Sequence, residues 1–363
     1  MNQQELLYWV WFSMVMGIGA QIEPILSLYT HPQAIFEARE KEDFSMVRGA
    51  AARRLQVVSL EDAARIIEEC EHRKVRILPF CHPQYPEKLR EISDPPAVLY
   101  CTGNPYLLEG RKMVAIVGSR THTAYGRQAA EQIAKELAAA GIVVVSGLAS
   151  GLDSVAHQAA LAENGLTVAV MGTGHDQCYP AQNAMLKAAI EQSGVVVSEI
   201  PPKERAQKHF FSLRNRIIAA LSDGVCVVEA RESSGTMTTA GYAQKYCRKL
   251  FSVPGSIFNP LSQGTNQLLN KGAIVCTSGK CIVESLGIES KPIEPKGNKP
   301  TMDIDGLSPD AKEVLQALLP TPQSMGMLAE KTQLPAWKLA AALTQLELGG
   351  QALQLAGKQY VLS

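Results

Sequence analysis

The chain has 363 residues, of which 46% are hydrophobic and 19% charged, a composition typical of folded globular proteins that excludes a disordered one. The chain has 35 Lys and Arg residues and 35 Asp and Glu residues, so its net charge is zero. The net charge therefore gives no indication of a nucleic-acid partner, and any such indication has to come from local clusters of charge. This length allows two or three domains.

Residues 1–75 have few strand-forming residues and are predicted to be helical. The apolar run Leu6–Met16 is shorter than the about 20 residues that span a bilayer. No Lys or Arg precedes Arg39, so the basic start of a signal peptide is missing as well. We therefore predict a buried helix here and a cytoplasmic protein without a membrane partner.

Two breaks interrupt this helical region, at Gly17-Ile18-Gly19 and at Thr30-His31-Pro32. A Gly-x-Gly between apolar helices can form a helix-hairpin-helix turn whose backbone N–H groups bind phosphate. It can also be a plain tight turn inside a small helical domain of the SAM or helix-hairpin-helix kind. We favour the plain turn, because so short a motif often matches by chance.

Residues 76–287 alternate short β-branched runs with amphipathic stretches. Because these runs are continuously apolar, both faces of each strand should be buried, which predicts an α/β domain with a mainly parallel, Rossmann-like sheet and helices on each side. One intervening helix is predicted over 126–140, before Gly141. The expected strands are 113–117, 142–145, 167–171, 195–198, 225–229, 250–253 and 273–276.

A polar, Pro-bearing linker is predicted over residues 288–305, followed by a C-terminal domain over 306–363. Helices are expected over 308–319, 325–332 and 335–348, and a strand over 359–362. Three helices with a small β-hairpin are typical of a winged helix. Its charges nearly cancel, which favours protein contact over the reading of duplex DNA.

Small residues gather where the strands of the central domain run into helices. Ligands of open parallel sheets bind at this edge, and free N–H groups at helix starts suit phosphate. We expect Asp153 to cap a helix instead and His157 to be packed. The residues expected to support a phosphate site are Gly118, Ser146, Gly151, Gly172, Gly174, Ser234, Gly235 and Thr236.

A cationic segment with two aromatic residues, Lys203–Arg216, follows the fourth expected strand. Cations that bind phosphates beside rings that stack bases are typical of single-strand binding. The alternative is that Phe210 and Phe211 enter the core, and it stays open for both residues. Arg120, which follows the first strand, would reach the same edge.

Several catalytic patterns are absent from the sequence. There is no P-loop, no Gly-x-Gly-x-x-Gly after the first strand and no Gly-x-Ser-x-Gly. The eight cysteines form no Cys-x-x-Cys pair, so we expect structural thiols and neither a metal site nor a cofactor.

The ordered motifs of the central region resemble those of the DprA/Smf family. The matching stretches are Tyr85-Pro86, Gly118–Arg120, Ser146–Ala149, Tyr179-Pro180, Ser198-Glu199, Arg214–Ile218, Ser234–Thr236, Pro254-Gly255 and Gly264–Asn266. Two positions depart from the family's usual pattern: Pro201-Pro202 stands in place of Pro-Gly, and Phe211-Ser212 in place of Phe-Pro.

The resemblance implies a non-catalytic homodimer that binds single-stranded DNA on its Rossmann-like domain. It also implies that the protein loads the recombinase RecA onto incoming DNA during natural transformation. Carried over by position, the expected DNA-binding residues are Ser119, Arg120, Gly147, Lys208, Phe211, Arg214, Asn215 and Arg216.

Two alternatives come from the same loops. Rossmann-like nucleotide hydrolases carry a catalytic glutamate in a Gly-Gly-x-Gly-Thr-x-x-Glu loop, but this sequence has Thr239 at that position, so the general acid/base is missing. A sensor of a small nucleotide remains compatible with the phosphate loops.

Overall fold

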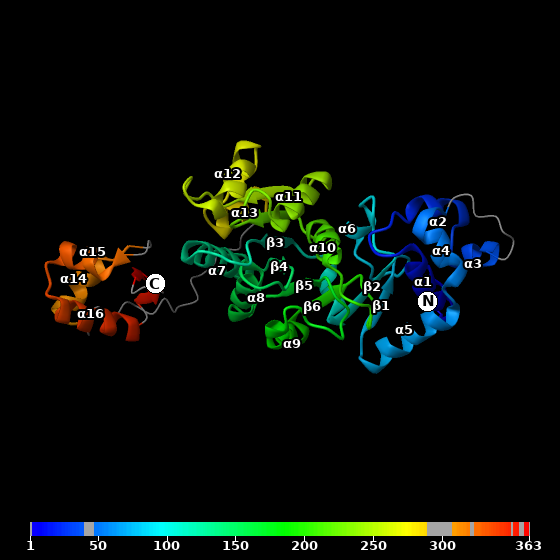
Figure 1. Cartoon of the computed structure of the whole chain (residues 1–363), viewed down its shortest axis with the longest axis horizontal. Coiled ribbons are helices and arrows are strands. Elements are labelled where there is room, and N and C mark those ends of the chain that lie inside the picture. The colour runs from blue at the N-terminus through cyan, green and yellow to red at the C-terminus, as the bar shows by residue number, and fades with distance from the viewer. Residues whose placement is uncertain are drawn as a thin grey trace. The chain divides into compact units, whose positions relative to one another are not determined.

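The computed structural model describes residues 2–39, 47–288, 307–319, 323–349, 351–355 and 359–362 (Figure 1). The chain divides into two compact units, Met1–Lys291 and Pro292–Ser363. Apart from Ile288, the predicted linker lies outside the described residues. Within the described ranges, no helix combines the length and apolar character needed to cross a membrane.

The N-terminal helices pack around α1 (Gln3–Met16), which confirms the predicted buried helix. Trp11 and Phe12 are completely buried, and α1 ends at Gly17, whose positive φ of 83° favours glycine. The other helices of this region are α2 (Glu23–Tyr29), α3 (Pro32–Arg39), α4 (Gly49–Val57) and α5 (Leu60–His72). Residues 40–46, between α3 and α4, lie outside the described ranges.

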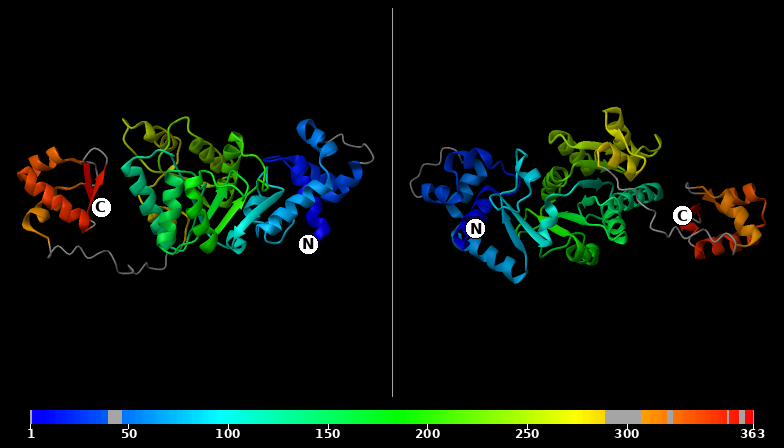
Figure 2. Two further views of the ribbon diagram at one scale, coloured as in Figure 1. Left: turned by 60° about the horizontal axis from the view of Figure 1, so that its bottom comes forward. Right: turned by 180° about the vertical axis from the view of Figure 1, so that it is seen from behind.

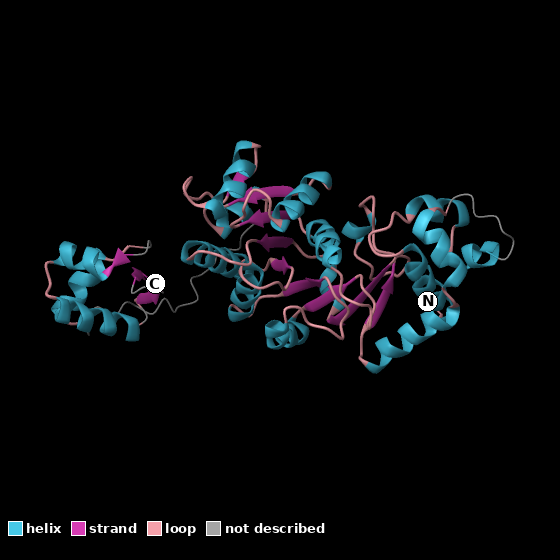
Figure 3. Cartoon of the chain, viewed as in Figure 1, coloured by secondary structure: helices cyan, strands magenta, loops and turns pink. Residues whose placement is uncertain are grey.

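The first unit contains a sheet that has nine strands in the described residues, in the order β1-β2-β6-β5-β4-β3-β7-β8-β9 (Figure 3). All seven predicted strands are present and parallel: β3 (Met113–Val117), β4 (Val143–Ser146), β5 (Thr167–Met171), β6 (Val195–Ser198), β7 (Gly224–Val227), β8 (Lys249–Ser252) and β9 (Ile274–Val275). Two further strands were not predicted from the sequence: β2 (Val98–Gly103), which pairs antiparallel with β6, and β1 (Arg76–Pro79), which pairs antiparallel with β2 at the sheet edge.

Helices cover both faces of the sheet, so alternate side chains of one strand enter different cores (Figure 2). In β3, Met113, Ala115 and Val117 pack with α10 and α11, whereas Val114 and Ile116 pack with α7, α8 and α13. The helices are α6 (Glu87–Arg90), α7 (Ala124–Ala139), α8 (Leu152–Ala162), α9 (Ala184–Ser193), α10 (Lys208–Leu221), α11 (Gly235–Lys245), α12 (Gln263–Asn270) and α13 (Gly279–Ser285).

The strand order places a topological switch point between β3 and β7. From β3 the chain adds β4, β5 and β6 on one side, and α10 then carries it back across the sheet to β7 on the other side of β3. In open parallel sheets, a crevice forms at the carboxyl ends of the strands where the order reverses. The loops after β3 and β7 border that crevice.

The second unit has the elements expected of a winged helix. The helices are α14 (Pro309–Ala317), α15 (Met325–Thr332) and α16 (Ala336–Leu348), and the strands are β10 (Gln323–Ser324), β11 (Ala352–Leu355) and β12 (Gln359–Leu362). The strands pair in the order β10-β12-β11 beside a core that includes Val314, Leu328 and Leu343. The predicted helices and the predicted strand are thereby confirmed.

Candidate nucleic-acid interface

A cavity of about 630 Å³ lies at the switch point, between the loops after β3, β4 and β7 and one side of α10. Of the predicted DNA-binding residues, it brings together Ser119, Arg120, Lys208, Phe211, Arg214 and Asn215. Gly118, Ser234, Gly235 and Thr236 line the same cavity. Gly147 lines a smaller pocket that shares Arg120, Phe211 and Arg214 with it.

Backbone hydrogen bonds position Arg120 at the mouth of the cavity. The Ser119 N–H donates to the carbonyl of Glu229 at 2.9 Å, and the Leu152 N–H donates to the carbonyl of Ser119 at 3.2 Å. Gly151 has a φ of 82°, and a Cβ there would lie 2.5 Å from the carbonyl oxygen of Arg120. The Arg120 side chain is exposed, so its charge faces solvent.

Arg214 is a buried cation that connects two strand ends. Its guanidinium donates to the carbonyl oxygens of Gly147 and Val170, and only 6% of the residue is exposed. Burial lowers its pKa to about 10, so it remains charged near neutral pH, facing Asp153. Gly147 makes room for this group, since a Cβ there would lie 2.6 Å from the guanidinium. Arg214 thus organises the cavity wall.

Asp153 completes this wall and corrects one expectation. Gly151 is the N-cap of α8, and Asp153 is the second residue of the helix, so Asp153 is not the predicted cap. Burial raises the pKa of its carboxyl, while Arg214 and the N–H groups of Ala149, Gly147 and Gly118 lower it.

His157 is fully buried beside Thr167, with a pKa lowered to about 3 by burial, which confirms the packed histidine.

An aromatic pair forms another wall of the cavity. Phe211 is half-buried, and its ring lies 5.2 Å from that of Tyr179 at an angle of 54°. Gly172 lies beneath Phe211, where a Cβ would be 2.8 Å from the ring. Tyr179 is 56% exposed and lines both pockets, so it offers a second ring that the sequence analysis did not select. Phe210, in contrast, is buried, which confirms the core alternative for that residue.

The remaining polar groups come from α10 and the loop after β7. Lys208 is exposed at the first position of α10. The Asn215 side chain donates to the carbonyl of Gly235 at 3.2 Å, which links the helix to the loop. Nothing would lie within 4 Å of a Cβ at Gly235, so the backbone there is open to a ligand.

Arg216 lies away from the cavity, which corrects its predicted DNA contact. The residue is completely buried, and its guanidinium donates to both carboxylate oxygens of Glu199 at 2.7 and 2.6 Å. Burial would lower its pKa, but the nearby carboxylates of Glu199 and Asp94 raise it above the ordinary value. Arg216 is therefore a structural cation and not a DNA ligand.

The same carboxylate settles the role of the Gly17–Gly19 turn. The Gly19 N–H donates to Glu199 at 3.1 Å, so this N–H is paired with a carboxylate of the protein and does not point at a phosphate site. A Cβ at Gly19 would lie 3.1 Å from Leu213 of α10. The plain-turn interpretation is confirmed, and the turn docks the N-terminal helices on the sheet domain.

Other small residues predicted at the site act behind it. Ser146 is buried and donates to the carbonyl of Ile116 at 2.6 Å, joining β4 to β3. Gly172 supports Phe211, as described above. Gly174 packs against the 201–202 backbone, where a Cβ would lie 2.5 Å from the Pro201 oxygen. These positions shape the loops without lining the cavity.

No group of three or more His, Cys, Asp or Glu side chains within the described ranges is arranged to hold a metal ion. Glu229, two residues after the end of β7, accepts hydrogen bonds from the hydroxyl and the N–H of Thr123 at 2.5 and 3.0 Å. Thr239 lines the cavity and is buried. The cavity therefore presents cations, hydroxyls, amides and rings, together with the carboxyl group of Asp153.

Comparison with known sequences finds two matching families. The family described as DNA recombination-mediator protein A matches residues 76–287, and the DprA winged helix domain matches residues 298–358. Protein Smf of Synechocystis is 31% identical over 399 aligned positions, which cover 99% of each chain.

Two solved structures are similar to this chain. DNA processing protein A of Streptococcus pneumoniae is 33% identical, with a TM-score of 0.67 over 77% of this chain and 97% of that one. DNA processing protein A of Helicobacter pylori, whose structure was determined to describe its single-stranded DNA binding mode, is 36% identical. Its TM-score is 0.54 over 59% of this chain and 95% of that one.

Proposed function

Because this chain belongs to the DprA/Smf family of DNA recombination mediators, we propose that it binds single-stranded DNA in the cavity at the switch point. The observation that carries the proposal is the convergence of exposed cations and a ring pair on one cavity. Arg120 and Lys208 bind phosphates, while Phe211 stacks a base. The likeness to the Helicobacter pylori protein supports this assignment.

The proposed activity is binding without a catalytic step. Two carboxylates at the carboxyl edge of the sheet are occupied by protein groups: Asp153, which lines the cavity, by Arg214 and backbone N–H groups, and Glu229 by Thr123. A general acid or base has to reach the reacting group, which neither carboxylate does in this arrangement. Thr239, which stands where the related hydrolases have their catalytic glutamate, also supports binding without catalysis.

Replacing Arg120 with Ala should weaken single-strand binding equally for all sequences, because a guanidinium on a phosphate reads no base. The slope of log K against log salt concentration should fall by about 0.7, the single-strand value for one phosphate contact. Fluorescence titrations of oligo-dT and a mixed-sequence strand at several salt concentrations measure both effects. An unchanged slope would remove Arg120 from the proposed interface.

The biological role that we propose is delivery of the bound strand to RecA in the cytoplasm during natural transformation. The recombination-mediator description of the family supports it. The domain division that we propose is a helical domain over 1–75, the DNA-binding domain over 76–287, the linker and a winged helix from 306. The winged helix contacts protein in this proposal, since Lys338 pairs with Asp310 at 3.4 Å instead of standing free.

We also propose a homodimer formed by the sheet domain. The edge strand β9 exposes Val275, and the segment between β8 and α12 exposes Ile257 and Phe258, the latter to 89%. A second copy that covers these apolar side chains would remove an unpaired sheet edge from solvent. Leu268 of α12, in contrast, belongs to the core of the domain and is not offered as a dimer contact.

Changing Phe258 to Asp should convert the dimer to a monomer at micromolar concentration, because a carboxylate is costly to bury in an apolar interface. Sedimentation velocity measures the mass. The exposed Met185 on α9, changed to Asp, is the matched control and should leave the dimer intact. A wild-type chain that sediments as a monomer would contradict the proposed assembly.

A further inference from the structure

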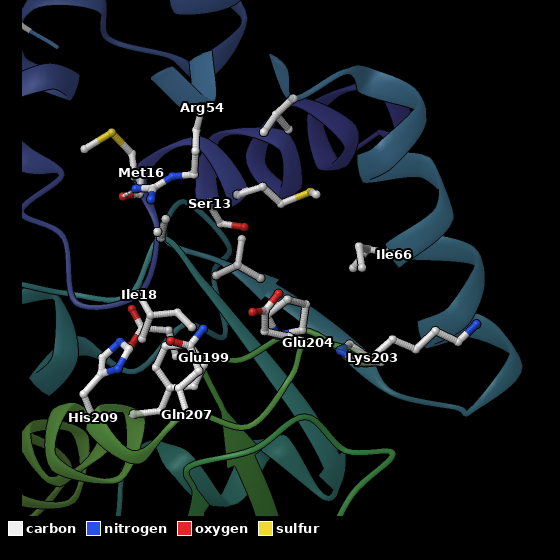
Figure 4. A pocket seen from close by; sticks show the side chains of 18 residues that line it. Ser13, Met16, Ile18, Arg54, Ile66, Glu199, Lys203, Glu204, Gln207 and His209 are labelled. Carbon is white, nitrogen blue, oxygen red and sulfur yellow. Dashed lines mark hydrogen bonds between the residues drawn. The ribbon is translucent and has the colours of Figure 1, made fainter. Parts of the chain in front are cut away.

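A second cavity, of about 580 Å³, lies between the N-terminal helices and the sheet domain (Figure 4). Arg54 of α4 reaches toward it from one wall, and Gln207 and His209 at the start of α10 line the opposite wall. Its interior includes the apolar side chains of Met16, Ile18 and others. The Arg54 guanidinium donates to the carbonyls of Val15 and Met16, which end α1, so its position is fixed.

This second cavity adjoins the proposed DNA site. Gln207 lines both cavities, so they flank the first turn of α10 on its two sides. Lys208 and Phe211 face the switch-point cavity, while His209 and Phe210 face the second one. The two cavities are therefore neighbours at the start of α10.

The charges around the second cavity favour a polyanion. Helix α4 carries Arg53 and Arg54 and no acidic residue, and Arg53 is exposed. On the other wall, Lys203 lines the cavity and pairs with Glu69, and Arg205, next to the lining residue Glu204, is exposed. Of the two acidic residues in the lining, Glu199 is neutralised by Arg216, and Glu204 stays as a local opposing charge.

We propose that the second cavity is an extension of the single-strand path, which binds the nucleotides that follow those held at the switch point. Bases lie against its apolar interior, and phosphates lie between Arg54 and the cationic segment before α10. The inference rests on the proposed function, because the strand has to be held first at Arg120 and Phe211. It gives the N-terminal helices a direct part in DNA binding.

The test compares strand lengths with a variant that preserves the fold. His209→Glu places a negative charge in the second cavity, while an acidic residue in the first turn of a helix stabilises the helix. Affinities are measured by fluorescence anisotropy for oligo-dT of about 6 and about 20 nucleotides, lengths near and beyond one binding site. Gln158→Glu, an exposed position on α8, adds the same charge elsewhere as the matched control.

His209→Glu should weaken binding of the longer strand by about fourfold at 0.15 M salt for each phosphate that the variant no longer binds, given a slope of about −0.7 per phosphate. Affinity for the short strand and both affinities of the control should stay unchanged. Equal affinities of wild type and His209→Glu for the long strand would overturn the extension and leave the switch-point site standing. Failure of the wild type to bind either length would refute the proposed function together with the extension.

Discussion

Replacing Glu199 with Ala is expected to lower the free energy of unfolding by about 3–5 kcal/mol, because it leaves a buried guanidinium without its counter-charge. Arg216 is completely buried, and its Nε and Nη1 have no hydrogen-bond partner among the described residues. Glu199 is therefore the carboxylate that both hydrogen-bonds to the guanidinium and balances its charge. The same change releases the Gly19 N–H. Urea denaturation followed by circular dichroism gives the free energy.

A double variant separates the effect of the charge from the effect of reduced packing. Replacing a buried ion pair by apolar residues of similar size is often neutral or stabilising. Glu199→Leu combined with Arg216→Met should therefore recover most of the stability that Glu199→Ala removes. If the single variant costs less than about 1 kcal/mol, as an exposed ion pair would, the structural role of Glu199 as a buried counter-charge is wrong.

Replacing Phe211 with Ala should weaken single-strand binding by about 1–3 kcal/mol, the value for one base stacked on an aromatic ring. This loss corresponds to roughly a 5- to 150-fold increase in Kd. The salt slope should stay unchanged, since every phosphate contact remains. Anisotropy titrations across salt concentrations distinguish this variant from Arg120→Ala.

Phe211→Trp is the matched control, because it keeps a ring face for the base and should retain binding. Thermal unfolding of each variant shows whether the ring has a role in the core instead. A Phe211→Ala variant that has a lower melting temperature while keeping its affinity for DNA would show that the ring packs and does not stack.

Continuous apolar runs made the parallel strands predictable. In β4 and β6 every residue is buried, so the sequence carries no polar alternation that would confuse the assignment. Strand β1 gave no such signal, because it is short, half-exposed and ends in Pro79. Its partner β2 follows Pro95 and Pro96, which are typical of a loop.

Helical periodicity explains which of the predicted residues of α10 line the cavity. Lys208, Phe211 and Asn215 recur at intervals of three and four residues, so they share the side of α10 that faces the cavity. Arg216 lies two positions beyond Arg214 and therefore points to another side, toward Glu199. The helical spacing therefore separates Arg216 from the residues that line the cavity, although the positive charge of the whole segment made all of them look like DNA ligands.

Tertiary packing decided the rest of the site. Tyr179 reaches Phe211 only because the loop after β5 folds over the start of α10, and no local pattern indicates that contact. Arg214 carries the charge of a ligand for phosphate, but its burial against two carbonyl oxygens makes it part of the wall. The sequence therefore predicted the charge of Arg214, whereas its burial, which the sequence does not show, determines that it supports the cavity wall.

The most direct test of the proposed function compares one labelled oligonucleotide as a single strand and as a duplex in the same buffer. A cavity that binds a base against Phe211 needs that base unpaired, so the single strand should bind more tightly. Unlabelled duplex should then displace it poorly, and a mononucleotide should not saturate the site. Duplex binding as tight as single-strand binding, or tighter, would contradict the account.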